Sequence, residues 1–313
     1  MTEKRLDANE VAFLSQQLEY LAKDRAVEIE YLGLQAMNFI DVNASAQPGM
    51  ATFAYYELDM SGDEAQWLTS NGDDISLVDV SSVKQVVSVY RAAEGFAFNS
   101  DELQEEAVAS MGLIPRRREA ARRAVMRKAD NVAAFGDAEK GLKGLANHSN
   151  VNILGAAAPA TGSDKAWAGG DKIPMEILAD LFSLANKVEE QTKGNHKANV
   201  LLLPLVQLHY IEQTPLDSGG TNSDSILTAF KKNRPGIDVQ VWHKLELADA
   251  AGTGPRALAY ERDRMNMEFL ITDPLKEDPI YQAGPRRFEV ALTMKFGGVV
   301  LYKPLAVAYM DDI

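Results

Sequence analysis

The spacing of apolar residues predicts several helices. Residues 7–23 carry Val and Leu three or four positions apart, the pattern of a short amphipathic helix. Residues 116–135 carry a stripe of Ala and Val at similar spacing, and Gly136 stands where a helix commonly ends. Three more helices are predicted, one after the capping residues 99–101, one from Pro174 to Gly194 and one over 223–233.

Branched and aromatic residues predict two long strands that form a hairpin. The first begins at Thr52 and the second covers 83–90, while the 61–82 stretch is rich in Gly, Ser, Asn and Asp. A two-stranded hairpin is at best marginally stable by itself in water. A long polar excursion is expected in a compact domain only where it has a use. We therefore expect the hairpin to reach a neighbouring subunit.

The remaining strands do not alternate regularly with helices. They are predicted at 200–203, 239–242, 256–260, 267–271, 288–294, 299–302 and 305–310. This mixture indicates an α+β fold. Before the hairpin, residues 31–43 are predicted to form an extended arm, and residues 44–49, which include Pro48, a hinge.

The composition narrows the class of protein. The 313 residues are 46% hydrophobic and 25% charged, which is typical of a globular chain. No stretch approaches the roughly 20 apolar residues that span a bilayer, and the polar start lacks the core of a secretory signal, so we expect cytoplasmic folding without a membrane. The absence of cysteine excludes disulfides and thiolate metal sites. A net charge of −13 argues against tight nucleic-acid binding, while loose contact with DNA stays open.

The sequence contains no recognisable catalytic pattern. The four histidines, His148, His196, His209 and His243, include no pair at the spacing of a helical metal site, and no HExxH occurs. No GxSxG elbow, P-loop or GxGxxG is present either. We therefore expect no catalytic residue, no cofactor and no metal.

Two segments carry opposite charge. Residues 57–83 contain no Lys or Arg, and their acidic residues are Glu57, Asp59, Asp63, Glu64, Asp73, Asp74 and Asp79. The predicted helix at 116–135 carries Arg116, Arg117, Arg118, Arg122, Arg123, Arg127 and Lys128 against Glu119. The two segments can be two solvated faces, or the acidic loop of one subunit can dock on the basic helix of its neighbour. A third interpretation is a basic strip that faces DNA. Trp67, near the tip of the hairpin, is either an interface anchor or locally packed.

The order of elements resembles the major capsid proteins of tailed double-stranded DNA phages, a fold shared with encapsulins. The most specific stretch is residues 131–137, which end in Phe-Gly-Asp, followed by the Gly-Leu-x-Gly-Leu-x-Asn of residues 141–147. It looks like the exit of that family's long spine helix. Looser matches are residues 67–68 and 75–80 in the extended loop, 230–237 in the axial domain, and 297–306 in the return strands.

The resemblance implies a division of the chain. Residues 1–48 would be the N-terminal arm and 49–98 the extended hairpin loop. Residues 99–164 and 263–299 would form the peripheral domain with its spine helix, and 165–262 with 300–313 the axial domain. The hinge near Pro48 and the Ala/Gly/Pro-rich loop at 155–170 would let one sequence fit non-identical environments.

The resemblance also implies partners. The chain would assemble with itself into the hexamers and pentamers of an icosahedral shell. It would meet scaffolding, portal and decoration proteins and touch packaged DNA loosely, in a virion assembled in the host cytoplasm. Only about fifty residues precede the hairpin, so we expect no built-in scaffold. Two alternatives stay open, an encapsulin-like nanocompartment and a soluble α+β enzyme without a recognisable motif.

Overall fold

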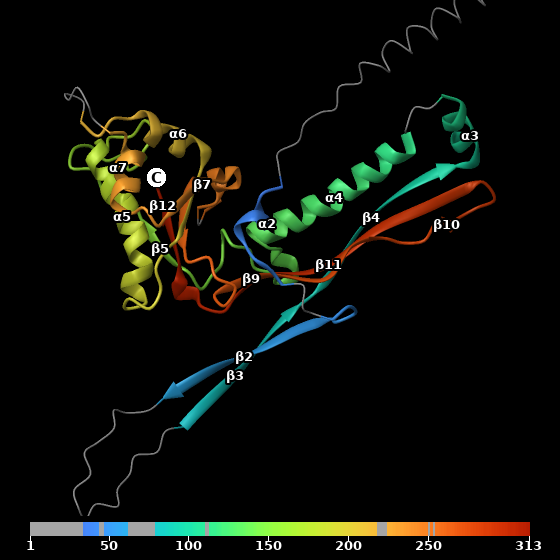
Figure 1. Ribbon diagram of the computed structural model, residues 1–313, viewed down its shortest axis with the longest axis horizontal. Helices are drawn as coiled ribbons and strands as arrows, with labels where there is room; N and C mark the ends of the chain where they lie inside the picture. Colours follow the sequence, from blue (N-terminus) through green and yellow to red (C-terminus); the bar gives the residue numbers. More distant parts are fainter. Residues whose placement is uncertain are drawn as a thin grey trace, which may run out of the picture.

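The computed structural model describes residues 34–43, 47–61, 79–109, 113–217, 224–249, 251–252 and 254–313. Helices and strands are mixed along this part of the chain, as Figure 1 shows, which confirms the predicted α+β class. The helix predicted at 7–23 and the tip of the predicted hairpin lie outside the described residues. None of the described helices combines the length and apolar character that a membrane crossing requires.

A long sheet forms one half of the molecule. Its strands run in the order β1 (Val42–Asn43), β9 (Met267–Glu277), β11 (Arg287–Leu301) and β10 (Tyr281–Gln282). Off this path, β4 (Tyr90–Asn99) pairs antiparallel with residues 287–296 of β11. Helix α4 (Leu113–Phe135) lies along this sheet in Figure 1, and α3 (Ser100–Ala109) precedes it. The helix buries Ala121, Val125, Ala129 and Val132, spaced three or four residues apart, against the sheet.

A compact sheet forms the other half. Its order is β5 (Asn152–Gly155), β12 (Val307–Asp311), β8 (Arg256–Tyr260), β6 (Val200–Leu203) and β7 (Asp238–Val241). Helices α5 (Pro174–Gln191), α6 (Leu205–Gln213) and α7 (Ile226–Asn233) contribute to the core on one face of it. Single 3-10 turns occur at η1 (Ala138–Lys140), η2 (His243–Leu247) and η3 (Pro304–Ala306). All four residues of β6 are buried, as expected of a strand covered on both faces.

The two faces of the compact sheet belong to two hydrophobic cores. Residues on one face pack with α5 and α7, namely Leu201, Leu203, Ala257, Ala259, Ala308 and Met310. Residues on the other face join the core of α4 and the long sheet, namely Val200, Leu202, Leu258, Tyr260, Val307 and Tyr309. The alternation follows the two-residue period of a strand. The two halves therefore share one core, and a shared apolar core holds them as one body.

The hairpin of β2 (Thr52–Ser61) and β3 (Asp79–Ser88) is a separate two-stranded sheet. Its strands pair antiparallel from Thr52↔Ser88 to Ser61↔Asp79. Figure 1 shows it projecting away from the body that the two larger sheets form.

Several elements differ from the sequence prediction. Strand β4 was not predicted, because Gly95 and the alanines near it have low strand propensity. The strand forms because β11 pairs with β4 along the whole length of β4. Strand β11 is one strand instead of two, since Gly297 and Gly298 form a bulge with a register shift and do not end the strand. Helix α6 was not predicted, and the predicted extended arm contains a helical turn, α2 (Ala36–Phe39).

Candidate assembly surfaces

One face of the hairpin is apolar and exposed. The register places Ala54 opposite Val86, Tyr56 opposite Lys84, and Leu58 opposite Ser82 on this face, which we call the outer face. The side chains of Tyr56 and Leu58 are 64% and 62% exposed, and Val86 and Val80 are 56% and 53% exposed. Clustered apolar side chains without cover are typical of a surface that meets another protein.

The opposite face, which we call the inner face, packs against the body only near the base of the hairpin. Phe53, Tyr55 and Val87 pack against a small cluster of Val89, Leu270 and Val300. The rings of Tyr55 and Tyr302 meet edge to face with centroids 5.0 Å apart. Burial of Tyr55, together with the nearby Glu57 carboxylate, raises the pKa of its hydroxyl. The hairpin is thus anchored at its base and free of the body further out.

The acidic tip lies outside the described residues. This applies to five residues predicted from the sequence to lie at a subunit interface, namely Asp63, Glu64, Trp67, Asp73 and Asp74. Of the acidic stretch, Glu57, Asp59 and Asp79 lie within the described residues, and Glu57 and Asp79 are exposed. The docking of this stretch therefore stays a prediction.

The outer side of α4 carries the predicted basic residues, but several are already paired. Arg117 bonds Glu102 at 2.9 Å and donates to the Ala97 carbonyl at 3.0 Å. Arg118 pairs with Glu277 at 3.2 Å, and Arg123 with Glu119 at 3.2 Å. These contacts tie the helix to α3 and to the end of β9.

Two of the predicted residues are available for an external partner. Arg116 and Arg122 are exposed, and neither makes an ion pair with any residue that the structure describes. The charge of the helix that can meet a neighbour is therefore smaller than the sequence indicated.

The end of α4 is closed by the loop that follows it. The Val132 carbonyl accepts from Gly136, the Ala133 carbonyl from Leu145, and the Ala134 carbonyl from Ala146. The side chain of Asn147 donates to the Phe135 carbonyl at 2.7 Å. The last four carbonyls of a helix have no partner within it, and here each has one from the loop.

Two glycines make this closure possible. Gly136 has a φ of 71°, the left-handed conformation that ends many helices. A Cβ on Gly144 would lie 2.4 Å from the Ala134 carbonyl oxygen, so only glycine lets the loop approach the helix this closely. The stretch that carried the family resemblance is thus a helix-closing device, which we call the exit loop (residues 136–151).

The exit loop is fixed to the compact sheet by buried polar contacts. Arg256 donates to the Ala146 carbonyl at 2.6 Å and holds Asp311 through two bonds of 2.6 and 2.7 Å. The Tyr309 hydroxyl donates to the Leu145 carbonyl and accepts from the His148 amide at 3.2 Å. Burial raises the pKa of the Tyr309 hydroxyl. The Arg256 bonds are charge-assisted, and together with the Tyr309 bonds they join the exit loop to the compact sheet.

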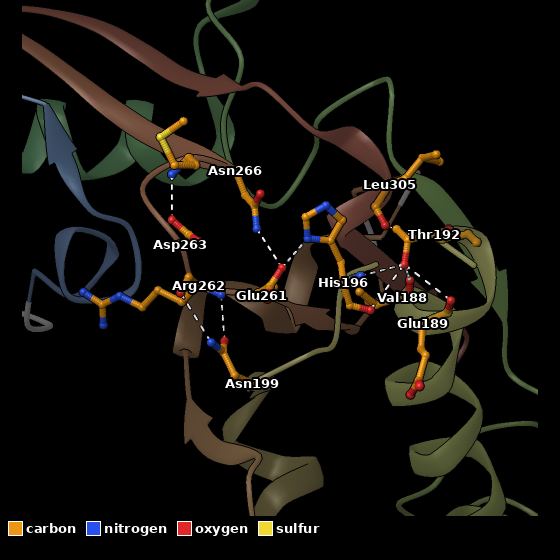
Figure 2. Close-up of polar contacts among 12 residues, drawn as sticks. Val188, Glu189, Thr192, His196, Asn199, Glu261, Arg262, Asp263, Asn266 and Leu305 are labelled. Carbon is orange, nitrogen blue, oxygen red and sulfur yellow. Dashed lines mark hydrogen bonds and ion pairs between the residues drawn. The ribbon is translucent and has the colours of Figure 1, made fainter. Parts of the chain in front are cut away.

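A second polar joint holds the crossing from β8 to β9, and Figure 2 shows it. Glu261 contacts the His196 ring nitrogen Nδ1 and accepts from the Asn266 side chain at 2.9 Å. Asn199 brackets the next residue, accepting from the Arg262 amide at 2.7 Å and donating to the Arg262 carbonyl at 3.3 Å. Hydrogen bonds to Glu261 and Arg262 thus hold the segment that connects β8 to β9 in place.

The start of the described chain is anchored by Asp130 of α4. Its carboxylate accepts from the Ala36 amide at 2.8 Å and pairs with Lys244 of η2. His243 bonds Gln35 at 3.1 Å, and burial together with Lys244 lowers the pKa of this histidine. The arm base is therefore clamped between the helix and the compact half.

The loop at 155–170, predicted to help one sequence fit non-identical environments, is held by one buried carboxylate. Asp180 of α5 accepts from Trp167 Nε1 at 3.0 Å and from the Ala157 amide at 3.3 Å, and it pairs with buried Lys172. Trp167 is fully buried. These contacts hold the loop to α5, and its fit to non-identical environments stays a prediction.

No chemical centre is evident in the described part of the chain. No group of three or more His, Cys, Asp or Glu side chains within it is placed to hold a metal ion. Three of the four histidines have separate partners. The His148 amide bonds the Tyr309 hydroxyl, the His196 ring contacts the Glu261 carboxylate, and the His243 ring bonds the Gln35 side chain. The features that stand out in this part of the chain are the exposed apolar face of the hairpin and the exposed basic residues of α4.

Comparison with known proteins agrees with this description. The family model described as "Major capsid protein" matches residues 63–313. The capsid of Myoviridae phage XM1 is 18% identical, with a TM-score of 0.79 and 100% of each chain covered. The protein of Mycobacterium phage Cain is 13% identical with a TM-score of 0.60, covering 95% of this chain and 92% of its own.

A third structure, from Microbacterium phage Oxtober96, is 12% identical with a TM-score of 0.60, covering 99% of this chain and 95% of its own. At such identities these likenesses show a common fold. No curated protein matches the chain. The family match covers most of the sequence, and the chain belongs to the major capsid protein family, as a shell-forming protein of a phage virion.

Proposed function

We propose that the chain builds an icosahedral shell of hexamers and pentamers around a phage double-stranded DNA genome. Each subunit contributes a rigid body and a hairpin that lies over its neighbour. Assembly takes place in the host cytoplasm, with scaffolding, portal and decoration proteins as further partners. The role of the chain in this proposal is structural, without catalysis.

The observation that carries the proposal is the uncovered outer face of the hairpin. Tyr56, Leu58, Val80 and Val86 are more than half exposed. Burying such a side chain stabilises an association by about 1.5–3 kcal/mol. Several such contacts per subunit add up in a closed ring, so each interface can be modest.

Charge supplies orientation in the same proposal. The acidic stretch, with Asp63, Glu64, Asp73 and Asp74, would dock near Arg116 and Arg122 of the neighbouring α4. Opposite potentials set orientation and register more than affinity. The helix would then receive the hairpin of one neighbour while its own hairpin reaches another.

The division into arm, hairpin loop, peripheral and axial domains keeps its predicted boundaries as part of the proposal. Some strands cross them. β4 (Tyr90–Asn99) and β11 (Arg287–Leu301) each span a boundary and pair with each other, and β5, within residues 99–164, pairs with β12, within residues 300–313. The last segment of the predicted peripheral domain thus shares a sheet with the end of the chain. The shared core supports treating both domains as one plate.

The outer face is tested by replacing Tyr56 and Leu58 with serine. We expect this double variant to fold but to give few or no shells, because the contact loses its apolar side chains. The measurement is the shell fraction in size-exclusion chromatography. The matched control is Val83→Ser, which removes an equally exposed side chain (57%) from the inner face and should leave assembly intact. Normal shells from the double variant would refute the role of the outer face.

The purified particles also decide what the shell encloses. Double-stranded DNA in particles from infected cells would support the genome-enclosing role. A protein cargo without DNA would support the encapsulin-like alternative.

A further inference from the structure

A polar crevice separates the hairpin from the exit loop. It has a volume of about 460 Å³. The hairpin wall includes Tyr55, Glu57 and Gln85, and the opposite wall includes Lys140, Lys143 and Asn150. The end of β11 forms the floor between the two walls. One wall is thus built on a projecting hairpin and the other on the rigid body.

The two walls carry opposite charges that are not paired with each other. Glu57 accepts from Gln85 at 3.2 Å and makes no ion pair with any described residue. The Lys140 ammonium lies 5.2 Å from the centre of the Tyr90 ring. Lys143 is exposed and has no carboxylate partner in the described part of the chain. Among the residues that the structure describes, Glu57 is the one acidic residue that lines the crevice.

The electrostatics of the neighbours agree with this arrangement. Burial and the Lys143 charge lower the pKa of His148, on the exit-loop wall, to about 4. On the hairpin wall, burial and the Glu57 charge raise the pKa of Tyr55. Each wall therefore carries a charge that an approach of the other wall would compensate.

The hairpin has a narrow base on which it can turn. The Val89 amide donates to the Ala51 carbonyl at 2.9 Å, and Lys295 donates to the Met50 carbonyl. Gly49, just before, has a φ of 93°, and a Cβ added there would meet no atom within 4 Å. The cluster at the base is small, with Val89, Leu270 and Val300 as its buried side chains. A small pivot and an open crevice favour motion of the whole hairpin.

We propose that the hairpin closes onto the exit loop as a strap, and that a Glu57–Lys143 ion pair holds the closed position. The strap is a property of the single subunit and goes beyond the shell-building role. In an assembling subunit it would give the hairpin two positions, one against its own body and one extended toward a neighbour. That last consequence alone rests on the proposed function.

The test uses disulfide cross-linking across the crevice in the full-length chain. The native sequence has no cysteine, so Gln85→Cys with Asn150→Cys introduces a single possible pair. A disulfide forms only when the two Cα atoms come within about 7 Å. The rate of intrachain cross-linking under mild oxidation is read on non-reducing gels, where links between chains migrate separately. A second pair, Asp79→Cys with Asn150→Cys, samples the far end of β3 and serves as the control.

The charge pair is tested by measuring the same rate in four backgrounds. We expect Glu57→Lys alone and Lys143→Glu alone each to slow cross-linking about two- to fivefold, the range for an exposed ion pair. The charge-swapped double variant should restore the rate. Equal rates in all four backgrounds, or a Gln85/Asn150 pair no faster than the control pair, would overturn the strap.

Circular dichroism of each variant shows that the chain is folded before its rate is used. The rates do not depend on shell formation. A chain that never assembles can therefore still confirm the strap, and a chain that assembles normally can still refute it.

Discussion

Single buried carboxylates join parts of the chain that are far apart in the sequence. Asp130 holds the arm base and η2 to the long helix, and Asp180 holds the loop at 155–170. Removing one partner from such a group leaves a buried charge or dipole without compensation, which destabilises a protein more than losing a surface pair. Neither aspartate stood out in the sequence, because nothing local distinguishes a buried aspartate from a solvated one.

His148 makes stability depend on pH. Burial, with Lys143 nearby, lowers its pKa from 6.5 to about 4, so the unfolded chain binds a proton more readily than the folded one. Stability from this group is present above pH 6.5 and is lost as the pH falls toward 4. We expect His148→Asn to flatten the fall of the melting temperature over this range. The same slope in wild type and variant would contradict the assignment.

At the scale of elements, the exit of α4 depends on close backbone approach. A Cβ at Gly144 would also lie 2.5 Å from the Gly136 amide nitrogen, and backbone cannot move aside as a side chain can. We expect Gly144→Ala to lower the free energy of unfolding by about 3 kcal/mol, measured by urea denaturation.

Gly155→Ala is the matched control for this substitution. The nearest atoms to a Cβ added at Gly155 would be 3.8 and 3.9 Å away, an ordinary contact distance. Its effect should stay within about 0.5 kcal/mol, as for surface positions in general. Equal effects of the two substitutions would show that the exit loop does not need glycine at position 144.

Local pattern predicted the elements whose stability is mainly local. Helices α4, α5 and α7 and strands β6 and β8 lie where apolar spacing, caps and branched runs indicated them. The sequence missed β4, which exists because β11 pairs with it, and α6, whose short apolar run has no strong periodicity. The pairing of two strands far apart in the sequence cannot be predicted from the residues of either strand alone.

The candidate surfaces were only partly predictable for the same reason. The sequence indicated a basic helix, and Arg116 and Arg122 do lie exposed on it. It could not show that Glu102 and Glu277 fold back onto Arg117 and Arg118. The apolar outer face was not predicted, because it appears only when the register of the two strands places Tyr56, Leu58 and Val86 on one face.

At the scale of the whole molecule, a shared core unites the long and compact sheets, and polar contacts fix the crossings between them. The subunit is therefore best described as one rigid plate with a hairpin attached by a small base. Such a plate transmits the geometry of its contacts, since packed interiors do not deform continuously. In the proposed shell, its shape follows from where the edges of the plates and the hairpins meet.

Charge reversal on the helix tests whether the plate receives a neighbour's hairpin. We expect Arg116→Glu with Arg122→Glu to abolish shells while the chain stays folded, because both residues are exposed and have no ion pair to lose within the described chain. Reversing Arg117 or Arg118 would also break pairs within the subunit.

Lys193→Glu with Lys231→Glu is the control for that experiment. It changes the net charge by the same amount at exposed positions of the compact half. Assembly is measured by light scattering. Loss of shells in both double variants would indicate a general charge effect, and intact shells in both would exclude docking on the helix.

The most direct test of the central claim is negative-stain electron microscopy of the purified chain, beside size-exclusion chromatography. Shell building predicts uniform shells, rings of five or six subunits, or sheets of such rings. A small, well-behaved oligomer that never assembles, even with a co-expressed scaffolding protein, would contradict it.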